Sequence, residues 1–426
     1  MQLVAYGAQD IYLTGNPQIT FFKVVYRRHT NFSMELIEQT FNGTVTGGGR
    51  VSATISRNGD LVHRMYVNYN PNAMLQNTSD GVYASFALLK EVEIEIGGQR
   101  IDKHYGHWMT AWHELTSNNP SCTLPSLKAA DGSSAEGIKY STAIPTGGGA
   151  NVELCMPPTM DQKAAFLCKY NCGASAIEET SAWVPLQFWF NRNPGLALPL
   201  IALQYHEVKC TITLAANTDI DIASTVNTSD LKLWAEYIYL DTDERRRFAQ
   251  VSHEYLIEQV QFQDSAASTA IDLNFNHPVK ELVFGGGRSG VGGQNGNPAT
   301  FTRLEVTTGV DARTVKTSHA NGTAVGLKLN GHDRFASQHL DYFTRTQVAA
   351  YHTGNGGVQT TDALGVYSFA LKPEEHQPSG TCNFSRIDNA QLTFSRATTG
   401  QTVRIYAVNY NVLRIMSGMG GLAYSN

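Results

Sequence analysis

Three carboxylates share one face of a predicted strand, and they are the first candidates for chemistry. Residues 89–96 alternate apolar and acidic side chains, which places Glu91, Glu93 and Glu95 on the same side. Two facing carboxylates are what a retaining glycosidase uses, one as nucleophile and one as acid and base. A solvated strand face has the same alternation, and no Trp-rich groove flanks this one. We therefore favour a solvated face over a glycan-cleaving site.

A glycine-rich segment matches the spacing of a dinucleotide-binding loop. Residues 285–290 read Gly-Gly-Gly-Arg-Ser-Gly directly after a predicted strand at residues 280–284. A dinucleotide site also needs a helix that opens at this loop, because the helix N-terminus binds the phosphates. Residues 291–298 are rich in glycine and end in proline, so they cannot form that helix. We predict a flexible loop and no bound cofactor.

Histidines gather in a segment that is predicted to be helical. The candidate zinc ligands are His104, His107, His113 and Glu114, with Cys168 and Cys172 further along the chain. Zinc proteins use spacings such as His-Glu-x-x-His or paired Cys-x-x-Cys, and these residues follow neither. We favour partly buried histidines and inert thiols, and we predict no metal site.

Asn-x-Ser/Thr triplets are candidate sites of N-glycosylation. They begin at Asn31, Asn42, Asn77, Asn227, Asn321 and Asn383. Such triplets arise easily by chance in a chain rich in Asn and Thr. We take Asn77, Asn227 and Asn321, which lie between predicted strands, as the candidate sites.

The composition indicates a β-rich chain with two domains. At 426 residues the chain exceeds what one hydrophobic core usually serves. Charged residues make up only 16%, below the roughly 25% of an average globular protein, which suits a protein packed into an assembly. The 38 glycines and 19 tyrosines are typical of strands joined by many turns.

Charge and hydropathy exclude several classes of protein. A net charge of −5 argues against direct nucleic-acid binding, which needs a basic face. The 6 cysteines are too few in this length for a disulfide scaffold. Residues 1–15 lack the features of a secretory signal, and polar residues interrupt the most apolar stretch, residues 183–203. We expect a soluble chain, made in the cytosol, that does not span a membrane.

A short phrase occurs twice and divides the chain into two halves. Leu-Ile-Glu-Gln occupies residues 36–39 and again residues 256–259. Predicted strands, a tight turn and a helix follow both copies in the same order, and such ordered similarity indicates a duplicated unit. The pattern predicts an all-β chain made of two eight-stranded antiparallel β-sandwiches of jelly-roll type, with short helices in the loops.

The expected boundaries follow from this division. Strands are predicted in the first half at residues 34–41, 50–56, 61–70, 89–96, 183–190, 198–203, 206–215 and 231–240. Strands are predicted in the second half at residues 253–263, 271–276, 280–284, 326–335, 366–372, 381–387, 390–395 and 403–415. Helices are predicted at residues 104–115, 241–248 and 340–351. The predicted domains are an arm at 1–26, a first jelly roll at 27–240 with an insertion at 117–181, a connector at 241–252, and a second jelly roll at 253–426.

Long motifs spread over the whole chain resemble those of one protein family. They occupy residues 7–22, 96–102, 194–203, 253–259, 377–388 and 409–415. In these segments the chain resembles the major capsid proteins of nucleocytoplasmic large DNA viruses, closest to the phycodnavirus and chlorovirus type. The departures from the family pattern lie in the predicted loops at 117–181 and 285–324.

The resemblance implies a double jelly roll that works by assembly, without enzymatic activity or cofactor. Three chains would form a pseudo-hexagonal capsomer, because two similar sandwiches per chain present six similar sides. Capsomers would tile an icosahedral virion shell around an internal membrane that the chain approaches but does not span. Minor capsid proteins would bind its inner face, and assembly would occur in the host cytoplasm. The family directs the loops of Asn77 and Asn321 outward. A glycan-binding or glycan-cleaving jelly-roll protein is the alternative.

Overall fold

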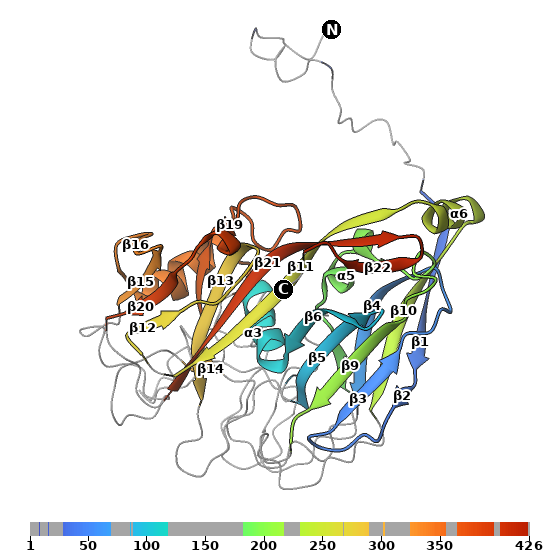
Figure 1. Ribbon diagram of the computed structural model, residues 1–426, viewed down its shortest axis with the longest axis horizontal. Helices are drawn as coiled ribbons and strands as arrows, with labels where there is room; N and C mark the ends of the chain where they lie inside the picture. Colours follow the sequence, from blue (N-terminus) through green and yellow to red (C-terminus); the bar gives the residue numbers. More distant parts are fainter. Residues whose placement is uncertain are drawn as a thin grey trace, which may run out of the picture.

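Two β-sandwiches make up the part of the chain that can be described. The computed structural model describes residues 8, 16, 29–69, 86, 88–117, 182–216, 231–266, 268–288, 301–302, 324–354, 364–395 and 401–424. Most of the expected arm and all but one residue of the expected insertion lie outside these ranges. The two sandwiches lie beside each other. Two long strands, β11 (His253–Ser265) and β21 (Gln401–Met416), run along their junction (Figure 1).

The first sandwich consists of two 5-stranded antiparallel sheets. The first sheet has the order β1 (Phe32–Gln39), β10 (Lys232–Leu240), β4 (Leu61–Tyr69) and β7 (Ala182–Pro185), with β8 (Leu198–Pro199) beside β4. The second sheet has the order β2 (Phe41–Asn42), β3 (Arg50–Thr54), β9 (Val208–Leu214), β5 (Leu89–Ile96) and β6 (Gln99–Tyr105). Alternate residues of these strands point into the sandwich, as period-2 patterns require. Val92, Ile94 and Ile96 of β5 are accordingly fully buried.

The second sandwich has a 7-stranded and a 5-stranded sheet. The larger sheet has the order β11 (His253–Ser265), β21 (Gln401–Met416), β13 (Pro278–Arg288) and β14 (Phe301–Thr302), with β18 (Leu364–Ser368) and β19 (Cys382–Asn383) beside β13 and β22 (Met419–Leu422) beside β21. The smaller sheet has the order β12 (Ala270–Asp272), β20 (Ala390–Phe394), β15 (Ala324–Leu329) and β16 (His332–Asp333), with β17 (Gln338–His339) beside β15.

The strand order confirms the duplication. The series β1-β10-β4-β7 of the first half corresponds to β11-β21-β13-β18 of the second, and β3-β9-β5-β6 corresponds to β12-β20-β15-β16. In each half the first strand therefore pairs antiparallel with a long strand near the end of that half, β10 or β21, which is the jelly-roll arrangement. Both copies of the Leu-Ile-Glu-Gln phrase lie on these first strands. The predicted fold class, an all-β double jelly roll, is confirmed.

Equivalent hairpin turns occur in both halves. Gly97 and Gly98, between β5 and β6, have φ angles of 58° and 81°, and Asn330 and Gly331, between β15 and β16, have φ angles of 52° and 79°. Two consecutive positive φ angles define the type I′ turn, whose twist matches that of the paired strands. Gly and Asn tolerate this conformation because they suffer least from its steric conflict.

Short helices connect the strands. They are α3 (Gly106–Thr116), α5 (Trp189–Arg192), η1 (Pro194–Leu196), α6 (Thr242–Gln250), the π-helix η4 (Tyr342–Thr346), α7 (Gln347–Tyr351) and η5 (Phe384–Arg386). Helix α3 is almost completely buried and lies at the junction of the sandwiches, whereas α6 buries no residue and links them at the surface (Figure 1). No helix in the described ranges is long and apolar enough to cross a membrane.

The two sandwiches share one hydrophobic core at their junction. The larger core cluster contains residues of the first sandwich, such as Trp108 of α3, together with Tyr406 and Val408 of β21. A second cluster, which includes Phe284 and Phe343, fills the interior of the second sandwich alone. Burial of large apolar side chains is the main stabilising contribution to a protein fold, so the junction is part of the folded core rather than a loose contact.

Several predicted strands are shorter than expected. The segment 183–190 is a strand only up to Pro185. Leu186 N still donates to Met65 O of β4, and the aromatic end of the segment then forms α5. The segment 198–203 leaves the sheet after Pro199, where Leu203 N donates to Leu200 O in a turn. The segment 381–387 is a two-residue strand followed by η5. The predicted helix 340–351 forms η4 and α7.

Candidate functional site: the charged junction between the sandwiches

The three carboxylates of β5 are neutralised by basic side chains. Glu93 has a side chain only 10% exposed, and its carboxylate lies 2.7 Å from Arg50 Nη2 and 3.5 Å from Lys103 Nζ. Lys103 Nζ also lies 2.9 Å from Glu91, and Arg50 lies 3.8 Å from Glu95. Burial alone would lower the pKa of Lys103, but the hydrogen bond to Glu91 and the nearby negative charges raise it. The expected solvated face is therefore wrong, because the sequence did not show that cations from β3 and β6 would flank it.

The glycine segment continues a strand, contrary to the predicted loop. Residues 285–288 extend β13, where Gly286 and Gly287 pair with β14 on one side and with β21 on the other. A Cβ atom at Gly287 would lie 2.5 Å from Thr402 Oγ1 and 2.7 Å from Arg404 Nε. Glycine allows the neighbouring side chains of β21 to approach this closely. Residues 289–298 lie outside the described ranges.

The candidate zinc ligands have separate partners. His104 Nε2 lies 2.9 Å from Asp102 Oδ2. His107 Nδ1 lies 2.5 Å from the Tyr406 hydroxyl, and His113 Nδ1 lies 3.0 Å from Ser117 Oγ. Burial lowers the pKa of His113 to about 4. Burial also lowers the pKa of His107 well below its usual value, and the nearby charge of Arg404 lowers it further. Among the described residues no group of His, Cys, Asp or Glu is arranged to hold a metal; Cys168 and Cys172 lie outside them.

The glycosylation candidates Asn77, Asn227 and Asn321 lie outside the described residues. The other triplets begin at exposed residues, and of these Asn383 accepts a hydrogen bond from Ser385 N at the start of η5. The basic run 245–247 lies among acidic residues of its own connector, at positions 241, 243 and 244. Its first residue pairs outside the connector, since Arg245 Nε lies 3.0 Å from Asp60 Oδ1, next to the start of β4.

The site that sequence reasoning missed is a buried ion network centred on Glu258. This glutamate belongs to the second Leu-Ile-Glu-Gln phrase and is 3% exposed. Its carboxylate lies 2.9 Å from Lys280 Nζ of β13, 2.9 Å from Arg192 Nη2 of α5 and 3.3 Å from His376 Nδ1. Arg192 also stacks over the ring of Trp112, 4.7 Å from its centroid. The network therefore joins a helix of the first sandwich to two strands of the second.

The electrostatics keep the Glu258 carboxylate ionised. Burial alone would raise the pKa of Glu258, but the charges of Arg192 and Lys280 and the hydrogen bond from His376 lower it to about 2. Burial lowers the pKa of Lys280, and the adjacent carboxylates of Glu258 and Glu281 oppose that effect. Lys280 is fully buried, and a buried charge is tolerated only when it is paired.

A second buried pair lies beside the first. His352 Nε2 is 3.1 Å from Glu281 Oε2, and His352 Nδ1 is 3.1 Å from Glu374 Oε1. Burial would lower the pKa of His352, but the two carboxylates raise it to about 9, so the ring is an imidazolium at neutral pH. The pairing of β13 with β21 shifts register between Val279 and Glu281, so the strand ladder is irregular at this point.

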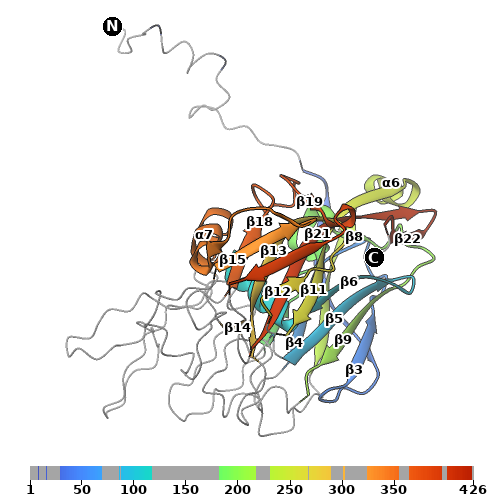
Figure 2. The ribbon, with the colours of Figure 1, turned by 60° about the vertical axis from the view of Figure 1, so that its left-hand side comes forward.

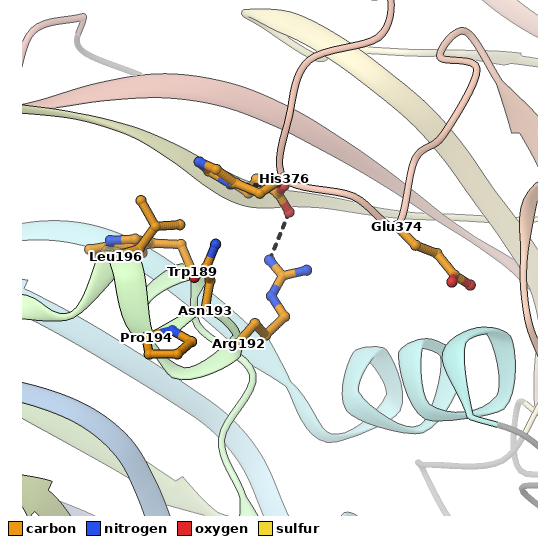
Figure 3. A pocket seen from close by; sticks show the side chains of 8 residues that line it. Trp189, Arg192, Asn193, Pro194, Leu196, Glu374 and His376 are labelled. Atoms are coloured by element: carbon orange, nitrogen blue, oxygen red, sulfur yellow. Dashed lines mark ion pairs between the residues drawn. The ribbon is translucent and has the colours of Figure 1, made fainter. Parts of the chain in front are cut away.

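A small cavity opens beside the network. It has a volume of about 230 Å³ and is lined by Trp189, Arg192, Asn193, Pro194, Leu196, Glu258, Glu374 and His376. Figure 3 shows α5 and the following turn on one side and the loop of Glu374 and His376 on the other, with the Arg192 ion pair between them. The lining carboxylates are already paired with cations, so the arrangement is suited to holding two sandwiches together rather than to acid–base chemistry.

Further hydrogen bonds cross the junction along its length. Gln259 Nε2 donates to Ile101 O, and Val260 N donates to Asp102 Oδ1. At the other end Gly354 N donates to Leu115 O, 2.7 Å away. Polar atoms of one sandwich thus find their hydrogen-bond partners in the other sandwich, and these bonds fix the relative position of the two sandwiches.

Two family models match consecutive parts of the chain. The model described as "Major capsid protein N-terminus" matches residues 20–241, and the model described as "Large eukaryotic DNA virus major capsid protein" matches residues 244–421. The chain belongs to the major capsid proteins of large eukaryotic DNA viruses. The resemblance seen in the sequence is confirmed, and the protein is a structural component of the virion capsid rather than an enzyme. The glycan-cleaving alternative is set aside.

Relatives in this capsid family match the chain from end to end. The chain is 48% identical to the major capsid protein of Pyramimonas orientalis virus and 42% identical to that of Paramecium bursaria Chlorella virus 1, over 100% of this chain and 99% of each relative. It superposes on a chain of the PBCV-1 virus capsid with a TM-score of 0.70 and 37% identity, which covers 96% of this chain and 100% of that one. The Faustovirus major capsid protein shares the fold, with a TM-score of 0.64 at 14% identity.

Proposed function

We propose that three copies of this chain associate into a pseudo-hexagonal capsomer that tiles an icosahedral capsid. The observation that carries the proposal is the equal strand order of the two sandwiches within one rigidly joined chain. Three such chains around a three-fold axis present six similar lobes, which suits a lattice position with six neighbours. Interfaces of an obligate assembly of this kind should bury more than about 2,000 Å².

Sedimentation equilibrium of the purified protein tests this proposal. We expect a species of three times the chain mass that persists on dilution to nanomolar concentration, because large, apolar interfaces dissociate slowly. A protein that stays monomeric at micromolar concentration, with its fold intact by circular dichroism, would contradict the trimer.

We further propose the partners that the family resemblance implies. Neighbouring capsomers would bind the rim of the trimer, and minor capsid proteins would bind its inner face near an internal membrane. Assembly would take place in the host cytoplasm, without direct contact to nucleic acid, which the net charge of −5 supports. Cross-linking mass spectrometry of intact virions would identify these neighbours.

The domain limits and modification sites also remain proposals. We propose an arm at 1–26, jelly rolls at 27–240 and 253–426, and a connector at 241–252; the sheets of the first half end at Leu240 and those of the second begin at His253, which supports these limits. We propose Asn77, Asn227 and Asn321 as glycan acceptors. Peptide mass spectrometry of capsids from infected cells would reveal modified asparagines.

A further inference from the structure

Large apolar side chains gather on the surface around the turn between β21 and β22. Tyr205 is 75% exposed, Met416 53%, Met419 51% and Val251 53%. Met416 pairs with Met419 across the turn, and Tyr205 N donates to Gly418 O, 3.0 Å away. Single exposed apolar residues are common on proteins, but a group of them indicates an interaction surface. We call Tyr205, Val251, Met416 and Met419 the apolar corner.

The apolar corner is built from three parts of the chain. A Cβ atom at Gly418 would lie 2.6 Å from Tyr205 Cδ2, so the tyrosine ring lies against the turn. His253 pairs with Ile415 just before the turn, which places the end of the connector, at Val251, beside it. The corner therefore combines a loop of the first half, the end of the connector and the C-terminal hairpin.

A segment of matching character precedes the first strand. Residues 17–28 lie outside the described ranges, and we call them the N-terminal segment. Within it, six of the residues at 19–26 are apolar or aromatic. It carries three cations, Lys23, Arg27 and Arg28, and no carboxylate. Removal of apolar side chains from water is favourable, so an apolar surface within reach is the expected partner of this segment.

Helix α6 leads from the start of β1 to the apolar corner. Phe32 at the start of β1 pairs with Leu240, and α6 begins at Thr242 and ends at Gln250, next to Val251. Both views place α6 and β22 at the same end of the molecule (Figures 1 and 2). A helix of 9 residues is about 14 Å long, which about four or five extended residues can span. The N-terminal segment is therefore long enough to reach the apolar corner of its own chain.

The charges along α6 match those of the N-terminal segment. The helix begins with three carboxylates, Asp241, Asp243 and Glu244, whereas its own arginines at 245–247 follow about one turn later. A chain that continues outward from residue 29 passes the beginning of α6 first, which brings the arginines at 27–28 beside these carboxylates. Opposite charges at a surface contribute modestly to affinity, and they fix the direction in which a segment lies.

We propose that the N-terminal segment lies along α6 of its own chain and covers the apolar corner with Phe21 and Phe22. Its arginines lie beside the carboxylates at the beginning of α6, and its aromatic residues lie on Met416 and Met419. The segment thereby ties the first strand of the chain to the C-terminal hairpin, across the connector between the sandwiches. This contact lies within one chain, so it does not depend on the proposed trimer.

Limited trypsin digestion of the full chain tests this contact. Trypsin cleaves after the three cations of the N-terminal segment, and a bound segment is cleaved only while it is detached. We expect the double variant Met416→Ser/Met419→Ser to raise the cleavage rate in the segment about tenfold, because the segment loses apolar contact area. The sequence that trypsin reads is unchanged, so a faster rate reports detachment. Leu371→Ser, at a residue 74% exposed between β18 and β19, is the matched control and should be cleaved at the wild-type rate.

A free peptide of residues 15–30 provides the reference rate. Trypsin should cleave it at least about tenfold faster than the same sites in the wild-type chain. Equal rates for the peptide and the wild-type chain, or a double variant that is cleaved no faster than the wild type, would overturn the inference. Met416 and Met419 are exposed, so the double variant should keep its fold, which circular dichroism verifies. None of these results bears on the trimer, which sedimentation measures separately.

Photo-cross-linking identifies the surface that the N-terminal segment contacts. Phe22→p-benzoylphenylalanine places a photoreactive ketone in the segment, and irradiation should link it to a peptide that contains Met416 or Met419. The linked product should keep the mass of a single chain under denaturing conditions, because both ends of the link belong to one chain. A product of two chains, a link to another part of the surface, or no link at all contradicts the proposed contact.

Discussion

The same residue has different roles in the two copies of one sequence phrase. Glu38 and Glu258 occupy equivalent positions in equivalent strands, yet Glu38 is on the surface and Glu258 is 3% exposed. The difference arises from what covers each strand. The first sandwich covers Glu258 and brings Arg192 to it, so the carboxylate keeps a pKa of about 2 in spite of its burial. Identical local sequence therefore does not determine the electrostatic role of a residue.

The buried His352 predicts a pH dependence of stability. Its pKa in the folded chain is about 9, above the roughly 6.5 of an unfolded histidine. A raised pKa stabilises the fold fully below the unfolded pKa, and the contribution is lost as the pH rises from about 6.5 through about 9. The shift corresponds to a stabilisation on the order of 3 kcal/mol. Urea denaturation of wild type and His352→Gln should therefore show a difference in unfolding free energy that shrinks by that order across this window.

A suitable control for this titration is His332→Gln, because His332 is exposed on β16. Its unfolding free energy should follow the wild-type pH profile. A His352→Gln variant whose difference from wild type stays constant between pH 6.5 and 9 would show that His352 does not carry the linkage.

At the level of elements, glycine decides where strands can pack closely. Gly365 of β18 pairs with Phe284 of β13, and a Cβ atom at Gly365 would lie 2.6 Å from Cε2 of that ring. Phe284 is 1% exposed and packs against Phe343 in the core of the second sandwich, so the ring has little room to move. The sequence pattern of alternating residues predicted this strand but did not indicate the contact.

Gly365→Ala should accordingly destabilise the chain by about 1–3 kcal/mol through overpacking. Gly421→Ala is the matched control, because the nearest atom to its Cβ is the terminal Oε1 of the Gln99 side chain, 3.1 Å away, which can rotate. Chemical denaturation monitored by tryptophan fluorescence would measure both. Equal stability of Gly365→Ala and wild type would contradict the close packing.

At the level of the whole molecule, the two sandwiches depend on each other. The shared core and the Glu258 network would be opened to water if the halves were separated, which exposes apolar area and unpaired charges. The structure is therefore two sandwiches in topology but a single unit in packing. A rigid chain of this kind would set the angle between neighbouring lobes of the proposed capsomer.

Separate expression of the halves tests this dependence. The fragment 253–426 alone should be insoluble or bind a hydrophobic dye strongly, because its β11-β21-β13-β18 face is uncovered. Co-expression with the fragment 1–252 should recover a soluble complex. A fragment 253–426 that is soluble, monomeric and cooperatively folded on its own would show that the junction is not needed for folding.

The sequence by itself determined the two-fold repeat, the all-β fold class and the capsid family. These features follow from the local alternation of apolar and polar residues and from the order of motifs along the chain. Neither of these depends on which distant strands become neighbours. It could not determine where β7 or β8 ends, that residues 285–288 remain in a strand, or that the carboxylates of β5 are paired. Each of these depends on a neighbour that is distant in the chain, such as β21 for Gly287 or β3 for Glu93.

The charged junction was decided by the tertiary structure alone. One signal was present, since Lys280 and Glu281 interrupt an otherwise apolar strand, and charges inside such a strand must be paired or exposed. The sequence does not show which of the two applies, because the partners Arg192 and His352 come from other elements far along the chain. Only the packing of the two sandwiches brings these groups within about 3 Å of each other, where the pairing becomes strong enough to retain buried charge.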